Sequence, residues 1–456
     1  MNIERLVEAQ RRYFATGQTR PLKHRLAALT SLERAILRHE DDLNEALRQD
    51  LKKSPFETYM CETGMVLSEL RFVRKHLPSY MKNKRVPTPL AQFHAKSFTS
   101  PEPYGVTLVM APWNYPFMLA LDPVIGAIAA GNCVVIKPSA YSPATSQVIS
   151  QIIEECFHPS YVAVVLGGRQ ENQALLDQRF DFIFFTGGVT VGRLVMEKAS
   201  RYLTPICLEL GGKSPCIVDQ TANIRVAARR IVFGKYLNCG QTCVAPDYLF
   251  VHEDVKDQLM EEIRKTILKF YGKEPLDNPS YGKIINEKHY NRLCGLMEGE
   301  TILMGGHRNP QTLQIAPTVL DHITPDSKVM QEEIFGPVLP VMTFRDIREV
   351  IHFVTSREKP LACYLFTRSK KVKKQVLNSV SFGGGCINDT IIHLATSHMG
   401  FGGVGQSGMG SYHGRESFET FSHRRSIVEK YNWIDMPVRY LPYGAVKEKL
   451  LHIFMR

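Results

Sequence analysis

The sequence predicts an α/β fold with a doubly wound parallel-sheet domain, a second α/β domain and a small β-ribbon element. Two observations lead to this prediction. From residue 105 onward, apolar runs of strand length alternate with segments of helix length, which is the order that parallel strands require. Upstream, residues 1–80 place apolar side chains at helical spacing, and residues 78–103 combine prolines with basic side chains.

The N-terminal 80 residues are predicted to be helical because apolar positions recur near the period of a helix face, with charged residues between them. These positions are Leu22, Leu26, Leu29, Leu32, Ile36, Leu37, Leu43 and Leu47. A basic, proline-containing stretch ends this pattern. The alternation of side chains over residues 91–98 favours an exposed ribbon there.

Strands and helices then alternate as far as Leu210. The predicted strands are 105–111, 133–138, 161–166, 181–185 and 205–210, and the helices are 117–130, 142–156 and 191–199. Right-handed crossovers of this length build a sheet covered on both faces, the Rossmann-like arrangement of dinucleotide-binding domains. A second α/β block follows, with strands over 248–252, 338–343 and 362–367.

The patterns divide the chain into three parts. Residues 1–80 and 104–210 form the predicted dinucleotide-binding domain, and residues 211–412 form the second domain. Residues 81–103 and 413–456 form a ribbon and a C-terminal tail. The length of 456 residues and an apolar content of 44% agree with two or three globular domains.

Composition also limits the location and the partners. Ten cysteines without a paired framework indicate a reducing compartment, and no apolar run reaches the length of a membrane span or forms a signal peptide. We therefore expect a cytoplasmic protein. The net charge of +11 comes from short, separated basic runs without interleaved aromatic residues, so we expect no nucleic-acid partner.

Cys243 and Glu209 are the residues that point most directly to chemistry. Cys243 lies in a turn of small residues, and Glu209 precedes a Gly-Gly pair. A thiolate that attacks a carbonyl and a carboxylate that activates water are the two parts of thioester chemistry. Most cysteines, however, are buried apolar side chains. Cys239 could pair with Cys243 at a metal, but no second Cys/His pair with zinc spacing accompanies them, so no metal is predicted.

A glycine-containing loop follows the fourth predicted strand. Thr186, Gly187 and Gly188 end that strand, and Gly192 lies in the helix start that follows, although a GxGxxG fingerprint is absent. Glycines there let a pyrophosphate approach backbone amides and the positive end of the helix. A tight strand-to-helix turn explains the same pattern.

Three further residues have two interpretations each. Lys137 ends a strand where an adenosine ribose binds in Rossmann-like folds, or is a solvated lysine. The Asn114 amide donates to a developing oxyanion, or forms an Asx turn before proline. Glu333 holds a ribose diol beside the Phe335 ring, or ends a helix that Gly-Pro terminates.

Taken together, these motifs resemble the aldehyde dehydrogenase superfamily. Their order and spacing match that family over nearly the whole chain, and the early cysteine and short N-terminal region resemble its class-3 branch. The matching segments are 112–114, 186–188, 208–213, 240–243, 333–337, 383–389 and 401–408.

The resemblance implies NAD(P)-dependent oxidation of aldehydes to carboxylic acids. Cys243 attacks the aldehyde, the Asn114 side chain and the Cys243 backbone NH stabilise the oxyanion, and Glu209 activates the water that hydrolyses the thioester. The residues implied at the cofactor are Trp113, Lys137, Thr186, Gly187, Gly188, Gly192, Glu333 and Phe335.

One position departs from the family pattern. Ala140 stands where the family usually has a glutamate that binds the adenosine ribose, so a 2′-phosphate meets no repulsion there and Lys137 can attract it. We therefore expect NADP to be tolerated beside NAD. For the substrate, Tyr115, Met118, Leu119 and Thr242 suggest an apolar tunnel for medium-chain aliphatic or aromatic aldehydes.

Other readings stay open at this point. A coenzyme A-acylating dehydrogenase is one, although such relatives generally lack the carboxylate that Glu209 supplies. A cysteine esterase is another, but it leaves the cofactor loops unexplained, and a non-catalytic protein on this fold is a third. By resemblance, the second domain is catalytic, and the ribbon and tail are oligomerisation elements of a homodimer.

Overall fold

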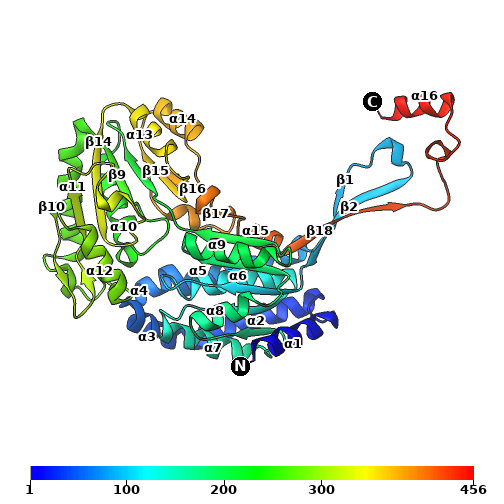
Figure 1. The fold of residues 1–456 in the computed structure, drawn as a ribbon, viewed down its shortest axis with the longest axis horizontal. Helices are drawn as coiled ribbons and strands as arrows, with labels where there is room; N and C mark the ends of the chain where they lie inside the picture. The colour runs from blue at the N-terminus through cyan, green and yellow to red at the C-terminus, as the bar shows by residue number, and fades with distance from the viewer. Residues whose placement is uncertain (1, 456) are drawn as a thin grey trace.

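The computed structural model describes residues 2–455, apart from the side chain of Phe454, as two α/β lobes and a projecting arm (Figure 1). Residues 1 and 456, which end the first and last predicted ranges, lie outside the described residues. The C-terminal helix lies at the far end of the arm, away from both lobes. Within residues 2–455, no helix is long and apolar enough to cross a membrane.

The first lobe is built on a six-stranded sheet in the order β17-β7-β6-β3-β4-β5. Its strands are β3 (Val106–Met110), β4 (Cys133–Lys137), β5 (Val162–Val164), β6 (Phe182–Gly187), β7 (Ile206–Leu210) and β17 (Gly408–Met409). The five predicted strands are all present and parallel, and β17 joins β7 in the antiparallel direction. The strand order reverses at β3, so a ligand crevice is expected at the carboxyl ends of β3 and β6.

Helical segments surround the six-stranded sheet of the first lobe. They are α1 (Ile3–Ala15), α2 (Leu22–Arg38), α3 (Glu40–Leu51), α4 (Pro55–Thr58), the π-helical turn η1 (Tyr59–Thr63), α5 (Gly64–Tyr80), α6 (Met118–Ala130), α7 (Pro143–Cys156), α8 (Arg169–Leu176), α9 (Val189–Ser200) and α15 (Gly414–Thr420). Every residue of α6 is buried because α2, α5 and α15 pack around it. The predicted helices correspond to α6, α7 and α9 within two residues at each end, whereas α8 was not predicted.

The predicted apolar face of the N-terminal helices is confirmed except at one position. Leu29, Leu32 and Ile36 are fully buried, but Leu37 is 45% exposed. The prediction was wrong for Leu37 because it directly follows Ile36. Two adjacent helical residues point about 100° apart, so both cannot face the same core.

The second lobe holds a seven-stranded sheet in the order β10-β13-β14-β9-β8-β15-β16. Its strands are β8 (Pro215–Val218), β9 (Tyr248–His252), β10 (Thr301–Met304), β13 (Thr318–Asp321), β14 (Val338–Phe344), β15 (Ala362–Phe366) and β16 (Gly384–Ile387), beside the small hairpin β11 (Arg308–Asn309) and β12 (Gln314–Ile315). Its helices are α10 (Ile224–Tyr236), α11 (Lys256–Tyr271), α12 (Glu287–Leu296), α13 (Ile347–Thr355) and α14 (Lys370–Ser379). Within the seven-stranded sheet all pairings except that of β10 are parallel, whereas the hairpin of β11 and β12 is antiparallel.

The arm consists of residues 82–103 and 422–455. Its three-stranded antiparallel sheet has the order β1-β2-β18, and a short helix follows it. These elements are β1 (Lys84–Val86), β2 (Ala95–Pro103), β18 (Ser422–Lys430) and α16 (Ala445–Phe454). The ribbon was therefore predicted in the right region, but its first part was wrong, because a 3-10 turn covers Leu90–Gln92 and the strand begins only at Ala95.

The structure also corrects the predicted boundary at residue 412. β17 pairs with β7 in the first lobe, and α15 packs against α5 and α6. The chain therefore returns from the second lobe to the first sheet before it enters the arm. The sequence hides this return because β17 is only two residues long and leaves no strand pattern.

Candidate active site

Cys243 lies in the loop between α10 and β9 of the second lobe, shortly after the turn formed by residues 237–240. Asn238 adopts a left-handed backbone with φ of 51°, a conformation that asparagine tolerates better than most residues. The loop is fixed by Gln241, whose amide nitrogen donates to the carbonyls of Asn238 and Lys283 and whose oxygen accepts from the backbone of Ile285. Because Gln241 is fully buried, the backbone around Cys243 is held rigidly.

Two cavities meet at Cys243. Cavity A has a volume of about 350 Å³ and lies at the carboxyl ends of β6 and β7. Cavity B has a volume of about 230 Å³ and lies between the start of α6 and the turn η1. Ten predicted site residues line cavity A, namely Trp113, Asn114, Leu119, Thr186, Gly187, Gly188, Glu209, Cys243, Glu333 and Phe335.

Two predicted cofactor residues lie apart from cavity A. The ammonium of Lys137 donates to the carbonyl of Pro138 at 2.7 Å, and burial lowers its pKa to about 8. Gly192 packs against β7, since a Cβ there would lie 2.6 Å from the side chain of Leu210. Neither residue therefore lines the cavity. Gly192 instead allows α9 to pack closely against β7.

Glu209 lies on β7 with its carboxylate deep in cavity A. Only 3% of the residue is exposed, and neither carboxylate oxygen has a hydrogen-bond partner among the described residues. Burial without compensation raises the pKa of this carboxyl well above its ordinary value. Thr186 also has a buried hydroxyl without a partner in the described part of the chain, so cavity A contains polar groups that await a ligand or water.

The thiol of Cys243 is held in its protonated form. Burial raises its pKa to about 12, and the nearby carboxyls of Glu333 and Glu209 act in the same direction. The backbone NH groups of Cys243 and Val244 face the sulfur and act in the opposite direction. The same NH groups are available to an oxygen that gains charge beside the sulfur.

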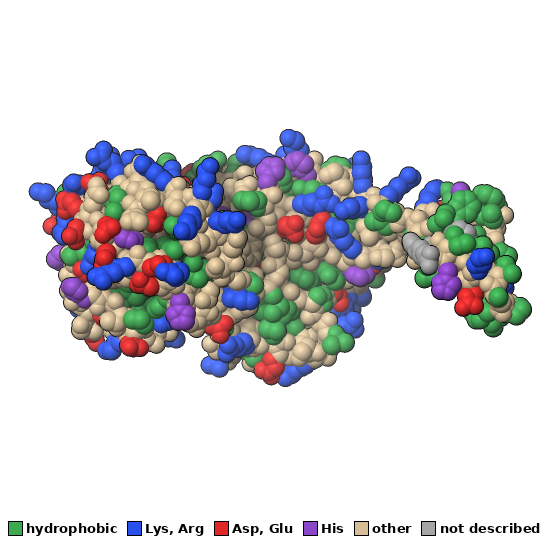
Figure 2. Space-filling view, turned by 90° about the horizontal axis from the view of Figure 1, so that it is seen from above, with side chains coloured by type: hydrophobic (Ala, Val, Ile, Leu, Met, Phe, Trp, Pro, Cys, Tyr) green, Lys and Arg blue, Asp and Glu red, His purple; other side chains and the backbone are tan. Residues whose placement is uncertain are grey.

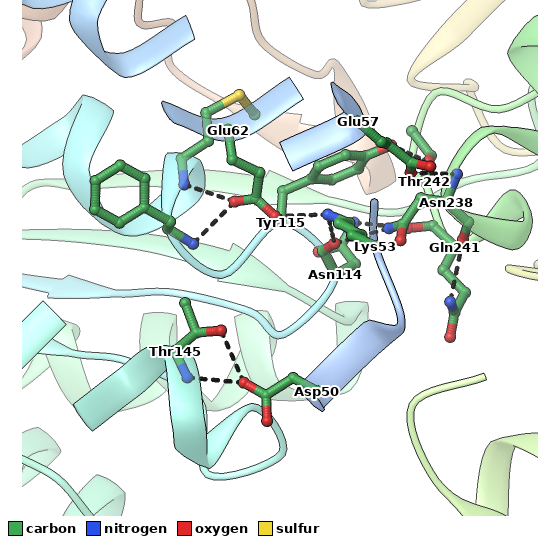
Figure 3. A network of polar contacts seen from close by, with 12 residues as sticks. Asp50, Lys53, Glu57, Glu62, Asn114, Tyr115, Thr145, Asn238, Gln241 and Thr242 are labelled. Carbon is green, nitrogen blue, oxygen red and sulfur yellow. Dashed lines mark hydrogen bonds and ion pairs between the residues drawn. The ribbon is translucent and has the colours of Figure 1, made fainter. Parts of the chain in front are cut away.

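Asn114 is held across the interface between the lobes. Its side-chain nitrogen donates to the carbonyl of Gln241 at 3.0 Å, which uses one of its two NH bonds. The backbone carbonyl of Asn114 accepts from the ammonium of Lys53 at 3.0 Å and from the side chain of Asn238 at 2.7 Å (Figure 3). The amide is thus anchored to the cysteine loop rather than closed into a local Asx turn.

The loop that carries Glu333 and Phe335 follows a 3-10 turn, not the helix that one interpretation required. Lys213 donates to the carbonyl of Glu332 at 2.7 Å and to Asp247 at 2.5 Å, so it ties this loop to the strand edge. Burial raises the pKa of Glu333 to about 8, and the charge of Asp247 adds to the effect. The Phe335 ring lies edge-on at 5.3 Å from that of Trp113.

Cavity B is lined almost entirely by apolar side chains, and all four predicted substrate residues line it. The hydroxyl of Tyr115 lies 2.7 Å from that of Thr242, so both polar groups are satisfied by each other. The remaining lining residues are Met60, Cys61, Met65, Phe233, Leu237, Val244, Ile391, Ile392, Leu394, Ala395, Phe401, Tyr412 and His413, besides Cys243.

Comparison with known proteins identifies the family. Residues 1–427 match the model of the aldehyde dehydrogenase family. The chain belongs to this family. It is 48% identical over its whole length, and over 99% of the relative, to 4,4'-diaponeurosporen-aldehyde dehydrogenase of Staphylococcus aureus. It is also 44% identical to aldehyde dehydrogenase family 3 member A2 of Rattus norvegicus, covering 94% of this chain and 88% of the relative.

Solved structures agree with this assignment. The substrate-bound state of Staphylococcus aureus AldH covers all of both chains with a TM-score of 0.98 and 47% identity. An NAD-dependent aldehyde dehydrogenase of Sinorhizobium meliloti covers 95% of this chain and 88% of its own, with a TM-score of 0.86 and 28% identity. The predicted fold and activity are therefore confirmed at the level of the family, and the chain is an NAD(P)-dependent aldehyde dehydrogenase.

The lining of cavity A fits the dinucleotide that aldehyde dehydrogenases use. The Cβ position of Gly188 has no atom within 4 Å, so the space above this helix start is open to a phosphate. A Cβ on Gly211 would instead lie 2.0 Å from the Glu333 carboxylate, so only glycine leaves room for that side chain. The unpartnered hydroxyl of Thr186 and carboxylate of Glu209 complete a polar cradle.

Among the cavity residues of this aldehyde dehydrogenase that sequence reasoning missed are two basic ones, His289 and Arg292, one turn apart on α12. Arg292 donates to the carbonyls of Glu333 at 3.3 Å and Ile334 at 2.6 Å. The ring of His289 lies 5.1 Å from that of Trp113, and burial and the nearby Arg292 lower its pKa to about 4. Basic residues three apart on a helix are common on solvated faces, so the spacing alone carried too little signal.

Proposed function

We propose that this aldehyde dehydrogenase oxidises apolar aldehydes through a covalent adduct on Cys243. The observation that carries the proposal is that Cys243 lines both cavities, whereas Cys61 lines cavity B alone. An aldehyde in cavity B can reach the sulfur from one side, and a dinucleotide in cavity A can approach the same carbon from the other.

Three side chains carry the chemistry in this proposal. The Cys243 thiol loses its proton to solvent and its sulfur attacks the aldehyde carbon, while the Asn114 amide and the Cys243 backbone NH donate to the oxygen that becomes negative. NAD(P)+ held in cavity A would supply the hydride acceptor, and loss of hydride from the adduct would leave the acyl group on Cys243 as a thioester. Glu209 then removes a proton from water, and its buried position makes its carboxylate a stronger base.

The first experiment follows NAD(P)H absorbance with hexanal and benzaldehyde in wild type and in Glu209→Gln. We expect steady turnover in wild type and a single burst in the variant, equal to the enzyme present, because the thioester forms but is not hydrolysed. Absence of reduction by a folded wild type with either cofactor contradicts the proposal. Steady turnover by the variant at the wild-type rate removes the role of Glu209.

Substrate choice follows from cavity B. Its apolar lining carries no cationic side chain, so we propose medium-chain aliphatic or aromatic aldehydes rather than charged semialdehydes. The Staphylococcus aureus relative is named for 4,4'-diaponeurosporen-aldehyde, and this aldehyde belongs in the panel of substrates. A strong preference for succinic semialdehyde contradicts the proposal.

The second prediction concerns the cofactor. Ala140 is exposed after the end of β4 and offers no carboxylate to repel a 2′-phosphate. We expect kcat/KM for NAD to exceed that for NADP by less than about a hundredfold, or about 2.7 kcal/mol. Ala140→Glu restores the repulsion and raises the preference for NAD. An unchanged ratio in that variant, or a larger preference in wild type, contradicts this view.

Two further proposals concern the setting of the enzyme. The ten cysteines are all free thiols in the described chain, which fits a reducing cytoplasm. The arm carries apolar side chains at its surface, which fits a homodimer joined through this element. A disulfide-free protein in the cytosolic fraction and the mass in solution test these two proposals separately.

A further inference from the structure

A buried ion pair lies behind the candidate active site. The ammonium of Lys53 and a carboxylate oxygen of Glu62 are 2.5 Å apart, and both side chains are completely inaccessible to solvent. Lys53 follows α3, and Glu62 belongs to the π-helical turn η1. Because desolvation of two charges offsets most of their attraction, a buried pair of this kind is weak evidence for stability and calls for another reason.

Glu62 holds the start of α6. Its second carboxylate oxygen accepts the backbone NH groups of Phe117 and Met118, both at 3.0 Å. These are among the first NH groups of the helix, which have no partner within it and favour a negative charge. Met118 and the following Leu119 line cavity B, so Glu62 fixes the wall against which a substrate lies.

Lys53 holds the other end of the same segment. Its ammonium donates to the carbonyl of Asn114 at 3.0 Å and lies 4.1 Å from the centre of the Tyr115 ring. The ion pair therefore binds the backbone of residues 114–118 at both ends of the segment. Figure 3 shows Lys53 between Glu62 and Asn114, with Tyr115 beside it.

Hydrogen bonds of Asn238 connect the segment of residues 114–118 and its ion pair to the loop that carries Cys243. The backbone NH of Asn238 donates to the carboxylate of Glu57, which precedes the π-helical turn. The side chain of Asn238 donates to the backbone carbonyl of Asn114, which Lys53 also binds. Gly64 ends the π-helical turn, where a Cβ would lie 2.5 Å from the carbonyl of Tyr59. Such turns occur frequently at functional sites because they redirect side chains.

We propose that Lys53 and Glu62 are positioning residues that set the side-chain amide of Asn114 relative to Cys243. They touch neither cavity A nor, through their own side chains, cavity B, and they act through the backbone of residues 114–118. This inference rests on the proposed role of Asn114 as an oxyanion donor. Misplacement of such a donor by about 1 Å is enough to cost a large factor in rate.

The test is a double-mutant cycle in kcat/KM for hexanal with NAD+. Asn114→Ala alone lowers this value about 100- to 1,000-fold. Lys53→Met lowers it about 10- to 100-fold when Asn114 is present. In the Asn114→Ala background, Lys53→Met lowers it less than about twofold, because there is no donor left to misplace.

Controls separate positioning from general damage. Asp50→Asn is matched, since Asp50 is also a buried carboxylate that accepts the first NH groups of a helix, at Ala144 and Thr145 of α7, but it does not contact Asn114. It lowers the melting temperature and leaves kcat unchanged. The dissociation constant for NAD+, measured by protein fluorescence, stays at its wild-type value in Lys53→Met and Asp50→Asn.

The outcomes distinguish the two proposals. An equal loss from Lys53→Met in both backgrounds overturns the positioning role while the proposed function stands. Full activity of Asn114→Ala overturns the oxyanion role itself. If Lys53→Met does not fold, the combined Lys53→Met and Glu62→Gln variant replaces it in the cycle, because removing both charges leaves no isolated buried ion.

Discussion

At the scale of single residues, the two reactive groups of the candidate site, the Cys243 thiol and the Glu209 carboxyl, are protonated and neutral at rest. The half-buried Cys243 thiol and the buried Glu209 carboxyl both have pKa values raised above their ordinary range. Glu333 adds a second carboxyl to the lining of cavity A, and Arg292 in the same lining donates to the backbone of the Glu333 loop rather than to either group. The carboxyls of Glu333 and Glu209 both oppose ionisation of the Cys243 thiol, so the thiol of the resting enzyme stays neutral beside the proposed nicotinamide site.

This arrangement predicts how Cys243 reacts with iodoacetamide without cofactor. Its pKa is raised to about 12, so labelling in wild type rises about tenfold per pH unit near neutrality. The pKa of Glu333 is raised to about 8, so this group is neutral at pH 6 and ionised at pH 9. An ionised Glu333 opposes loss of the thiol proton, so Glu333→Gln labels faster than wild type at pH 9 but equally fast at pH 6.

The measurement is mass spectrometry of the peptide that contains Cys243. The half-buried Cys386 lies outside both cavities and serves as an internal reference in the same sample. A ratio of variant to wild-type labelling that stays constant from pH 6 to pH 9 contradicts the electrostatic link between Glu333 and the thiol.

The residues that sequence alone predicted are those whose motifs combine a reactive group with a special backbone. Cys243, Glu209 and Asn114 each stand in such a segment, and the structure brings all three to one cavity. Lys53 and Glu62 gave no such signal. Both are charged residues between helices, where a solvated surface is the usual expectation, and only the fold reveals that they are buried.

At the scale of elements, predictability followed the strength of the apolar pattern. The central strands β3, β4 and β6 are continuous apolar runs and were predicted, because a sheet covered on both faces demands them. Helix α8 was missed since its eight residues are mostly polar and bury only Leu175 and Leu176. The π-helical turn was also missed, because one extra residue in a helix leaves no periodic signal.

Two glycines of one element allow a direct test of the cofactor loop. Gly188 has open space at its Cβ position and an ordinary negative φ, so Gly188→Ala keeps its stability but places a methyl group in cavity A. We expect the KM for NAD+ to rise at least tenfold while the melting temperature stays the same. Gly192→Ala presses α9 against Leu210 and costs about 1–3 kcal/mol of unfolding free energy.

Kinetics and thermal melting of the two variants are measured side by side. The pattern expected is a change of cofactor KM at constant stability for Gly188→Ala, and a loss of stability for Gly192→Ala. An unaltered KM for NAD+ in Gly188→Ala shows that the phosphate does not approach this helix start.

At the scale of the whole molecule, the arm projects from the two lobes and packs against neither of them along most of its length (Figure 1). It extends beyond them in Figure 1, and hydrophobic side chains gather at its end in Figure 2. Its exposed large apolar side chains are Val86, Leu90, Phe93, Val428, Trp433, Tyr440, Leu441, Tyr443, Val446, Leu450, Leu451, Ile453 and Met455. A monomer seldom leaves so continuous an apolar surface in contact with water.

The proposed homodimer gives this surface a partner and predicts how to weaken it. Val446, Leu450 and Ile453 recur at helical spacing, so they share one face of α16, and Val446 and Ile453 are 75% and 63% exposed. We expect light scattering to give about twice the chain mass of 51.7 kDa for wild type. Glutamates at both Val446 and Ile453 put charge into an interface of about 800 Å² per partner and raise its dissociation constant at least tenfold.

His452→Glu is the matched control for this pair, because it adds a glutamate to another face of the same helix. It leaves the dimer intact, and the lobes melt at the same temperature in all three proteins, since α16 lies at the end of the arm. A wild type that keeps the mass of one chain at every concentration contradicts the dimer. Equal weakening by His452→Glu means that net charge, rather than the apolar face of α16, controls association.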